Sequence, residues 1–231
     1  NEKGQQYHIC VEKGQIGRYV LLPGDPGRTD LIAKFLDNPK LVAYNREHKT
    51  WTGYLDGEMV SVTSTGMGGP SAAICLEELI HAGAETFIRV GTCGRICEES
   101  YNKKYEGVVI TGAIRHEGTT VQYIPIEYPA MADRHVTDAL VKSAQEQGFC
   151  FAEGIAQCKD SFYGQHDPDS MPSGFMLKSY WEAWEKAGVM ASEMESATVF
   201  IVAAIRGKRA GALMAYEHMN ENTIRTAIGA I

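Results

Sequence analysis

The chain has no hydrophobic run long enough to cross a membrane and no excess of basic residues. Its longest apolar stretches, such as residues 201–205, fall far short of the roughly 20 residues that a membrane-spanning helix needs. Lys and Arg together number 22 against 29 Asp and Glu, which gives a formal net charge of −7. Because this charge repels polyanions, we expect neither a nucleic acid nor a membrane as a partner. An anionic substrate would need a local cationic pocket.

Cysteine pairs typical of a zinc or redox site are also missing. The chain contains no C-x-x-C motif and no His at the spacing of a zinc site. We interpret the six cysteines as reduced, buried thiols: Cys10, Cys75, Cys93, Cys97, Cys150 and Cys158. Residues 1–4 contain no apolar signal core, so we expect a cytoplasmic protein.

The length and composition indicate one domain with an α/β fold. A chain of 231 residues, 44% of them hydrophobic, can bury a sizeable core without a metal or a disulfide. No repeat or Pro/Ser linker divides residues 1–231. Alternating strand and helix patterns, with a hairpin at Asp56-Gly57, predict a mixed central sheet flanked by helices. The expected strands are 18–23, 51–55, 58–64, 86–90, 108–114, 149–158 and 210–214, and the expected helices are 28–35, 71–81, 133–147, 179–186, 196–206 and one from residue 221.

Three glycine-rich segments lie at expected strand ends, where open α/β sheets bind ligands. Residues 24–28 (Gly-Asp-Pro-Gly-Arg) and 65–71 (Thr-Gly-Met-Gly-Gly-Pro-Ser) each begin a helix, whose backbone N–H groups suit an anion. Residues 89–94 (Arg-Val-Gly-Thr-Cys-Gly) add a second arginine beside a hydroxyl. Each segment alone also fits an ordinary turn, but together they predict an oxyanion-binding cradle.

Two carboxylates, Glu193 and Glu195, precede the expected helix 196–206. Both positions suit acidic residues that cap a helix. A carboxylate there can equally accept both hydroxyls of a ribose, because it offers two acceptor oxygens. The residues alone leave both interpretations open.

Five segments in this order resemble the nucleoside phosphorylase family, and within it the uridine phosphorylases. The resemblance runs from His8 to about Ala215 and implies a role in pyrimidine salvage. The implied reaction is the reversible phosphorolysis of uridine to uracil and ribose 1-phosphate. With 2′-deoxyuridine or thymidine, it would give uracil or thymine and the 2′-deoxy sugar phosphate. The segments are 24–28, 64–71 (Ser-Thr-Gly-Met-Gly-Gly-Pro-Ser), 89–94, 160–165 (Asp-Ser-Phe-Tyr-Gly-Gln) and 193–196 (Glu-Met-Glu-Ser).

The resemblance, carried over residue by residue, implies subsites for phosphate, ribose and base. Inorganic phosphate would be the co-substrate and no cofactor would be required. Arg89, Gln165 and Glu195 would act in catalysis. Because His8 and Arg46 match residues that reach a neighbouring subunit's site, a homo-oligomer is implied, either a dimer or a hexamer. The matching positions are Gly24, Arg28, Arg46, Arg89 and Thr92 for phosphate, His8, Met194 and Glu195 for ribose, and Phe162, Gln165 and Gly94 for the base.

The resemblance also implies a cation site between subunits. Some members of the family hold a potassium ion at the positions of Glu47, Met67 and Ser71.

The chain departs from the family pattern after Gln165. Uridine phosphorylases usually have an Arg shortly after this Gln, but residues 165–172 read Gln-His-Asp-Pro-Asp-Ser-Met-Pro. His166, a water or an Arg from elsewhere would have to replace it, and 216–220 is too short for the family's flap over the base. A purine phosphorylase and a nucleoside-binding protein without turnover therefore stay open as alternatives. Against the purine enzyme, residues 212–215 contain no Asp to protonate the base.

Overall fold

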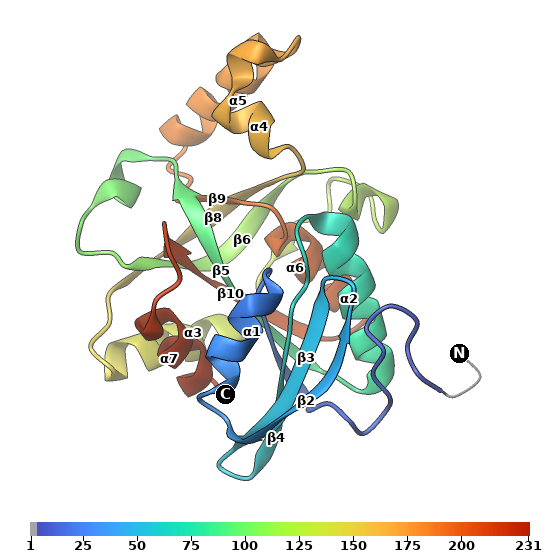
Figure 1. The fold of residues 1–231 in the computed structure, drawn as a ribbon. Coiled ribbons are helices and arrows are strands. Elements are labelled where there is room, and N and C mark those ends of the chain that lie inside the picture. Colours follow the sequence, from blue (N-terminus) through green and yellow to red (C-terminus); the bar gives the residue numbers. More distant parts are fainter. Residues whose placement is uncertain (1–3) are drawn as a thin grey trace.

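A computed structural model of the chain describes residues 4–231 (Figure 1). This part forms one mixed sheet of ten strands. The strands are β1 (Tyr19–Leu22), β2 (Asp37–Asn45), β3 (His48–Leu55), β4 (Glu58–Thr63), β5 (Thr86–Arg95), β6 (Gly107–His116), β7 (Ala130–Met131), β8 (Phe151–Lys159), β9 (Ala191–Glu193) and β10 (Arg209–Tyr216). Their order is β10-β6-β8-β9-β5-β1-β4-β3-β2, and β7 pairs with β6.

Strand β10 closes part of this sheet into a ring. It pairs in parallel with β5, from Arg209 opposite Thr86 to Tyr216 opposite Cys93, and antiparallel with β6. Because β5 also pairs with β9, the strands β10, β6, β8, β9 and β5 form a closed cycle. The strands β1, β4, β3 and β2 extend from β5 as an open sheet that ends at β2.

Helices cover both faces of the sheet, as Figure 1 shows. Successive residues of the central strands alternate between two hydrophobic clusters, Phe87 and Ala212 belonging to one, Ile88 and Leu213 to the other. This alternation is what a sheet buried on both sides requires. The helices are α1 (Pro26–Ala33), α2 (Gly69–Ala82), α3 (Arg134–Glu146), α4 (Phe162–His166), α5 (Gly174–Lys186), α6 (Ser196–Ile205) and α7 (Glu221–Gly229). The α/β prediction is confirmed.

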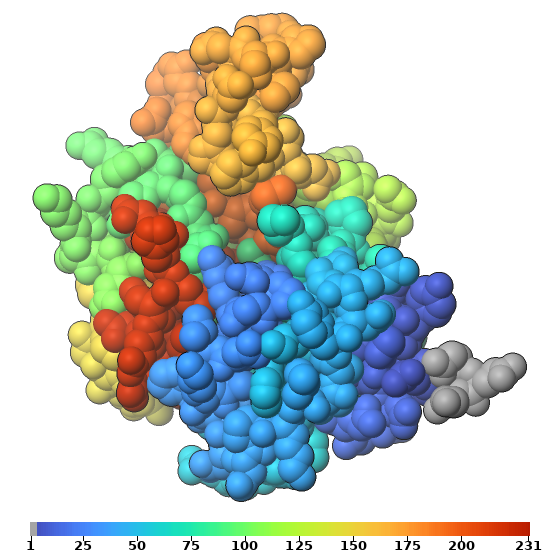
Figure 2. All heavy atoms as spheres, viewed as in Figure 1, coloured from blue at the N-terminus to red at the C-terminus, as the bar shows by residue number. Residues whose placement is uncertain are grey.

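Helices α4 and α5 stand out from the sheet at the top of Figures 1 and 2. They pack on one another, and the rings of Tyr180 and Trp184 in α5 contact the ring of His116 in β6. The segment thereby overhangs the ends of β6 and β8.

Most expected elements are present, but three expectations need correction. The hairpin at Asp56-Gly57 is confirmed, with Leu55 opposite Glu58. The expectation that the strand from residue 86 ends at residue 90 is wrong, because β5 continues to Arg95 along β10. Strand β2 is absent from the sequence expectations, since it is a largely exposed edge strand without apolar alternation. Helix α5 begins at Gly174 rather than at residue 179.

The cysteines are all unpaired, as expected, but not all are buried. Cys150 is exposed and Cys10 half-buried, so the expectation of a buried thiol is wrong at these two positions. Burial raises the pKa of the others where a shift is resolved, which disfavours a reactive thiolate. The buried ones are Cys75, Cys93, Cys97 and Cys158.

The N-terminal expectation falls partly outside the structure. Residues 1–3, where the sequence shows no apolar signal core, lie outside the described residues. Within 4–231, no helix combines the length and the apolar character needed to span a membrane.

The close pairing of β6 with β10 makes Gly107 sensitive to any side chain. A Cβ there would lie 2.0 Å from the backbone O of Met214, so strand β10 would have to shift. We expect Gly107→Ala to destabilise the fold toward the upper end of the roughly 1–3 kcal/mol that overpacking costs. Urea denaturation measures this. Gly118→Ala is the control, because its Cβ would meet only ordinary contacts; equal stability of the two variants would contradict the β6–β10 register.

Candidate active site

The candidate site lies where β1 and β4 end beside the middle of β5. Strand β10 pairs with β5 up to Cys93, whereas β1 pairs with it only up to Arg89, opposite Leu22. Within the described residues, no strand therefore pairs with residues 90–93 on the side of β5 opposite to β10. The segments that leave β1 and β4 form a rim there, because the Thr65 N–H donates to the Pro23 carbonyl at 2.9 Å.

The first glycine segment, 24–28, turns into α1 through an Asp cap. The Asp25 carboxylate accepts the Gly27 N–H at 2.8 Å, so the expectation of open N–H groups is wrong at Gly27. Arg28 lies in the first turn of α1 with its side chain half-buried. No ion pair engages its guanidinium within the described chain.

The second glycine segment requires glycine at Gly66 and Gly68. Their φ angles are 71° and 88°, and a Cβ on Gly66 would lie 2.6 Å from the Ser71 Oγ. The Gly68 N–H, at the start of α2, donates to Oε1 of Glu195 at 2.5 Å. The sequence predicts that the N-terminus of α2 binds an anion. In the structure, the carboxylate of Glu195 occupies this position.

Arg89 is the centre of the site and is held by two carboxylates. Its side chain points away from solvent, with 4% of the residue exposed. Nε donates to Oε2 of Glu193 at 3.1 Å, and Nη2 donates to Oε2 of Glu195. Glu193 also accepts the backbone N–H groups of Glu195 and Ser196, at 2.9 Å each. Glu193 therefore caps α6 and orients Arg89, and Glu195 is the carboxylate left between Arg89 and Gly68.

The charges of this cluster depend on one another. Burial works against the positive charge of Arg89, but Glu195 and Glu193 outweigh it and raise the pKa of the guanidinium. Burial raises the pKa of the Glu195 carboxyl, which Arg89 opposes and Glu193 reinforces. The contact with the guanidinium favours the ionised form of Glu195.

One nitrogen of Arg89 has no partner. Nη1 is buried and makes no hydrogen bond in the described structure. A buried N–H without an acceptor costs roughly 1–3 kcal/mol, more when it is charged. An oxygen of a bound anion would remove this cost, so Nη1 marks where an oxyanion fits.

Two other implied phosphate residues, Gly24 and Thr92, lie at the same end of the sheet as Arg89. Gly24 follows β1 two residues after Leu22, and its carbonyl accepts the Gly66 N–H at 3.0 Å. Thr92 is half-buried in β5, three residues beyond Arg89. The structure thus brings three chain segments to the open side of β5.

His8 and the turn that contains Arg46 are linked through Asn45. The Asn45 amide donates to the His8 carbonyl at 2.7 Å, and Arg46 is exposed in the two-residue turn between β2 and β3. The His8 Nδ1 lies 2.7 Å from Oε1 of Glu78, so its ring is fixed with Nε2 on the other side. No contact joins either residue to Arg89 in the described chain, and the structure does not bring them into its own site.

The residues of the implied potassium site come together in part. The Ser71 Oγ lies 2.8 Å from Oε1 of Glu47 and 2.6 Å from the Thr65 carbonyl. A hydrogen bond from its own backbone and the Ser71 hydroxyl lower the pKa of the Glu47 carboxyl, which keeps it anionic. Met67 is 86% exposed beside them. Oxygen ligands of this kind suit a hard cation. Within 4–231, no group of three or more His, Cys, Asp or Glu side chains could hold a metal.

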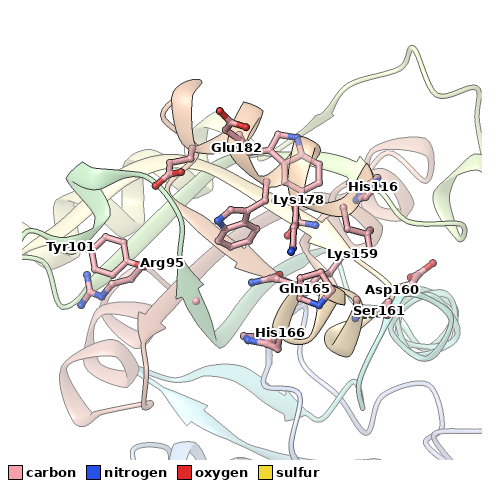
Figure 3. A pocket seen from close by; sticks show the side chains of 18 residues that line it. Arg95, Tyr101, His116, Lys159, Asp160, Ser161, Gln165, His166, Lys178 and Glu182 are labelled. Atoms are coloured by element: carbon pink, nitrogen blue, oxygen red, sulfur yellow. Dashed lines mark hydrogen bonds between the residues drawn. The ribbon is translucent and has the colours of Figure 1, made fainter. Parts of the chain in front are cut away.

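A cavity of about 710 Å³ lies between β5, β8 and the α4–α5 segment (Figure 3). Gly94 and Gln165, two residues implied for the base, line it together with His166. Oε1 of Gln165 lies 2.6 Å from the Ser192 hydroxyl, which fixes the amide. The geometry gives a planar ring a polar edge to bind.

Two other implied residues lie beside this cavity rather than in it. Phe162 is exposed and packs its ring on His166, with the centroids 4.2 Å apart, but it is not among the residues that line the cavity. Met194 is half-buried between the two carboxylates of the cluster.

Comparison with known proteins matches the Phosphorylase superfamily model over residues 18–227. The chain belongs to the phosphorylase superfamily. It is 45% identical to a uridine phosphorylase of Treponema pallidum (strain Nichols), over 98% of this chain and 93% of that protein. A uridine phosphorylase of Thermococcus kodakarensis is 44% identical, over 93% and 77% of the two chains. A guanosine phosphorylase of Halorubrum lacusprofundi is 40% identical, over 90% and 81%.

Two cations that line this cavity, Arg95 and Lys159, were not predicted from the sequence. Arg95 lies at the end of β5, and its guanidinium stacks over the Tyr216 ring at 3.8 Å from the centroid. Lys159 ends β8 and is buried, although lysine is rarely buried. One feature of the sequence could have indicated Lys159. It is a charged residue at the end of a strand, directly before Asp160.

Removal of Arg89 should destabilise the fold in a pH-dependent manner. Arg89→Met leaves Glu193 and Glu195 buried as like charges, which we expect to cost roughly 3–5 kcal/mol near neutral pH. Without the guanidinium, burial and repulsion by Glu193 raise the folded-state pKa of the Glu195 carboxyl further above its unfolded value. A raised folded pKa means that the stability deficit is smaller at pH 5 and grows as pH rises through that pKa.

Urea denaturation between pH 5 and pH 8 measures this difference. Arg28→Met is the matched control, because no carboxylate holds Arg28 within the described chain, and its effect should be small and flat with pH. If the stability lost in Arg89→Met became smaller toward pH 8, the buried contact of Arg89 with Glu193 and Glu195 would be contradicted.

Proposed function

We propose that this enzyme catalyses the reversible phosphorolysis of uridine to uracil and ribose 1-phosphate. The observation that carries the proposal is the unpartnered Nη1 of Arg89 beside the Glu195 carboxylate, because one offers a place to an oxyanion and the other to a pair of hydroxyls. The cavity at Gln165 adjoins this pair through β9, since Ser192 precedes Glu193. The uridine phosphorylases among its relatives support the choice of base.

In the proposed reaction, phosphate displaces the base at the anomeric carbon. A phosphate oxygen forms a bond to C1′ while the bond between C1′ and the base nitrogen breaks, and its electron pair leaves with the base. Positive charge that develops on the sugar lies near the phosphate and near Glu195. Arg89 and Arg28 hold the phosphate in position for attack, which is most of the catalytic task.

Binding of substrates must loosen contacts present in this structure. Both oxygens of Glu195 are engaged, one by the Gly68 N–H and one by Arg89. Phosphate at Nη1 would draw Arg89 toward itself, and Glu195 would exchange these donors for the ribose hydroxyls. Such an exchange keeps the number of hydrogen bonds that Glu195 accepts at two.

The proposal includes a homo-oligomer with shared sites and a cytoplasmic location in pyrimidine salvage. Asn45, the neighbour of the exposed Arg46, donates to the His8 carbonyl, and neither His8 nor Arg46 contacts Arg89 in the described chain, which supports a role in a neighbouring subunit. A potassium ion at Glu47 and Ser71, close to Arg46, would bind in the same region. Unpaired cysteines fit a reducing compartment.

A purine phosphorylase is the second candidate, supported by the guanosine phosphorylase among the relatives. Strand β10 argues against it, because 212–215 reads Ala-Leu-Met-Ala, is buried, and offers no acid to protonate a purine. A nucleoside-binding protein without turnover would keep the same cavity.

Base release distinguishes these candidates. We expect the protein to release uracil from uridine only when inorganic phosphate is present, with thymidine slower or equal and with little release from cytidine or inosine. Chromatography of the products, with and without phosphate, measures this. Turnover of inosine or guanosine alone would establish the purine enzyme, and nucleoside binding without any release would establish the binding protein.

Complementation between subunits tests the shared site. We expect His8→Ala and Gln165→Ala to be nearly inactive alone, because each removes one substrate contact from every site. After subunit exchange, a mixed dimer contains one site with both residues intact, so about one quarter of the wild-type activity should return.

Each variant exchanged with itself is the control, and mass spectrometry of the labelled subunits verifies the exchange. Verified exchange without recovery would mean that His8 serves the site of its own subunit.

A further inference from the structure

Lys159 is a buried cation that the reaction described above leaves without a role. Only 6% of the residue is exposed, yet it makes no ion pair within the described chain. Its Nζ donates to the Ser192 hydroxyl at 2.6 Å, and it makes no other hydrogen bond there. An ammonium carries three donor hydrogens, so two remain to be satisfied. A buried charge in this state is costly unless something else binds it.

The position of Lys159 places those donors at the base cavity. Lys159 lines the cavity together with Gln165 (Figure 3). The two are joined through one hydroxyl, because the Ser192 Oγ lies 2.6 Å from Lys159 Nζ and 2.6 Å from Gln165 Oε1. A ring that reaches the Gln165 amide therefore comes within reach of the ammonium.

The surrounding charges do not neutralise Lys159 directly. Burial lowers the pKa of its ammonium, and Glu193 and Glu195 oppose that shift. Both carboxylates, however, are engaged elsewhere, by Arg89 and by the backbone N–H groups of α6 and of Gly68. The carboxylates favour a charged Lys159 while its hydrogens stay free for an acceptor in the cavity.

The other two cations of the cavity, Arg95 and Lys178, are engaged by other groups. Arg95 stacks on Tyr216, donates to the Ser100 carbonyl, and lies toward Tyr101 in Figure 3. Lys178 is exposed and paired with Asp169.

Burial favours the neutral form of the two histidines in the cavity. Burial lowers the pKa of His166, whose ring stacks on Phe162, and Lys159 lowers it further. Burial also lowers the pKa of His116, which packs against the α5 aromatics.

We propose that Lys159 contacts a carbonyl oxygen of the leaving pyrimidine and supplies the positive charge that residues 165–172 lack. The inference rests on the proposed phosphorolysis and deepens it. When the bond between C1′ and the base nitrogen breaks, its electron pair spreads onto the ring oxygens of the base. The ammonium stabilises this anion by a charge-assisted hydrogen bond, without transferring its proton. Lys159 thereby favours a base that leaves as an oxyanion.

The kinetic test compares leaving groups. Lys159→Met removes the charge at similar volume, and we expect it to lower kcat/KM for uridine by roughly 10²–10³. The loss should be about tenfold smaller for 5-fluorouridine, because its base anion needs less stabilisation. The KM for phosphate should stay unchanged, and Lys159→Arg should recover part of the activity. Lys142→Met, on the exposed side of α3 and outside the residues that line this cavity, is the control expected to leave activity intact.

A binding test works whether or not the protein turns uridine over. We expect Lys159→Met and Lys159→Gln to weaken binding of 5-nitrouracil, a uracil that is anionic near neutral pH, by roughly 10–100-fold, the worth of a charged hydrogen bond. Calorimetry measures this, and Gln maintains the contact to Ser192 if Met perturbs the fold. If the wild-type protein bound 5-nitrouracil but released no uracil from uridine, the proposed function would be overturned, but the contact of Lys159 with the base would not. Variants that bind it like wild type, or that lose uridine and 5-fluorouridine turnover equally, would overturn the role of Lys159.

Discussion

The buried contact of Arg89 with Glu193 and Glu195 is the interaction on which the rest of the site depends. It joins β5, β9 and the start of α6, and through Glu195 it reaches the start of α2 at Gly68. Three buried charges are expensive to desolvate, and their mutual attraction repays this only when the geometry is good. The cluster is thus better explained by what it binds than by stability, and its one unpartnered nitrogen indicates the direction of the ligand.

The closed ring of strands explains why such a cluster can exist inside a sheet. Strand β5 has β10 along one side up to Cys93, but on the other side β1 ends at Arg89. A regular sheet would continue there and fill the space with backbone. Since β1 and β4 turn away into glycine segments, polar side chains occupy the opening without breaking the ladder on the other side. The fold thereby creates a polar interior next to hydrogen-bonded strands.

The sequence predicts the motifs of the site better than their surroundings. Local patterns were sufficient for the Asp56-Gly57 hairpin, because turn chemistry depends on adjacent residues. Local patterns failed where pairing with a distant strand determines the length of a strand. Gly91 and Gly94 suggested a strand end, but β5 pairs with β10 and extends to Arg95. Lys159 was missed for the same reason, since its partner Ser192 lies 33 residues away in the chain. Spacing alone reveals no contact of that kind.

Ser192 connects the two halves of the site and limits what the base edge can be. Its hydroxyl accepts from Lys159, and its single hydrogen can go to only one of two amide oxygens, those of Gln157 and Gln165. When it goes to Gln165, Oε1 is occupied and Nε2, on the side of Gly94, is the group free to donate. Lys159 and Gln165 then both present donors, which matches a ring edge rich in carbonyl oxygens. A base that presents an amino group at that edge would leave these donors unpaired, so the hydroxyl of one serine contributes to the choice of base.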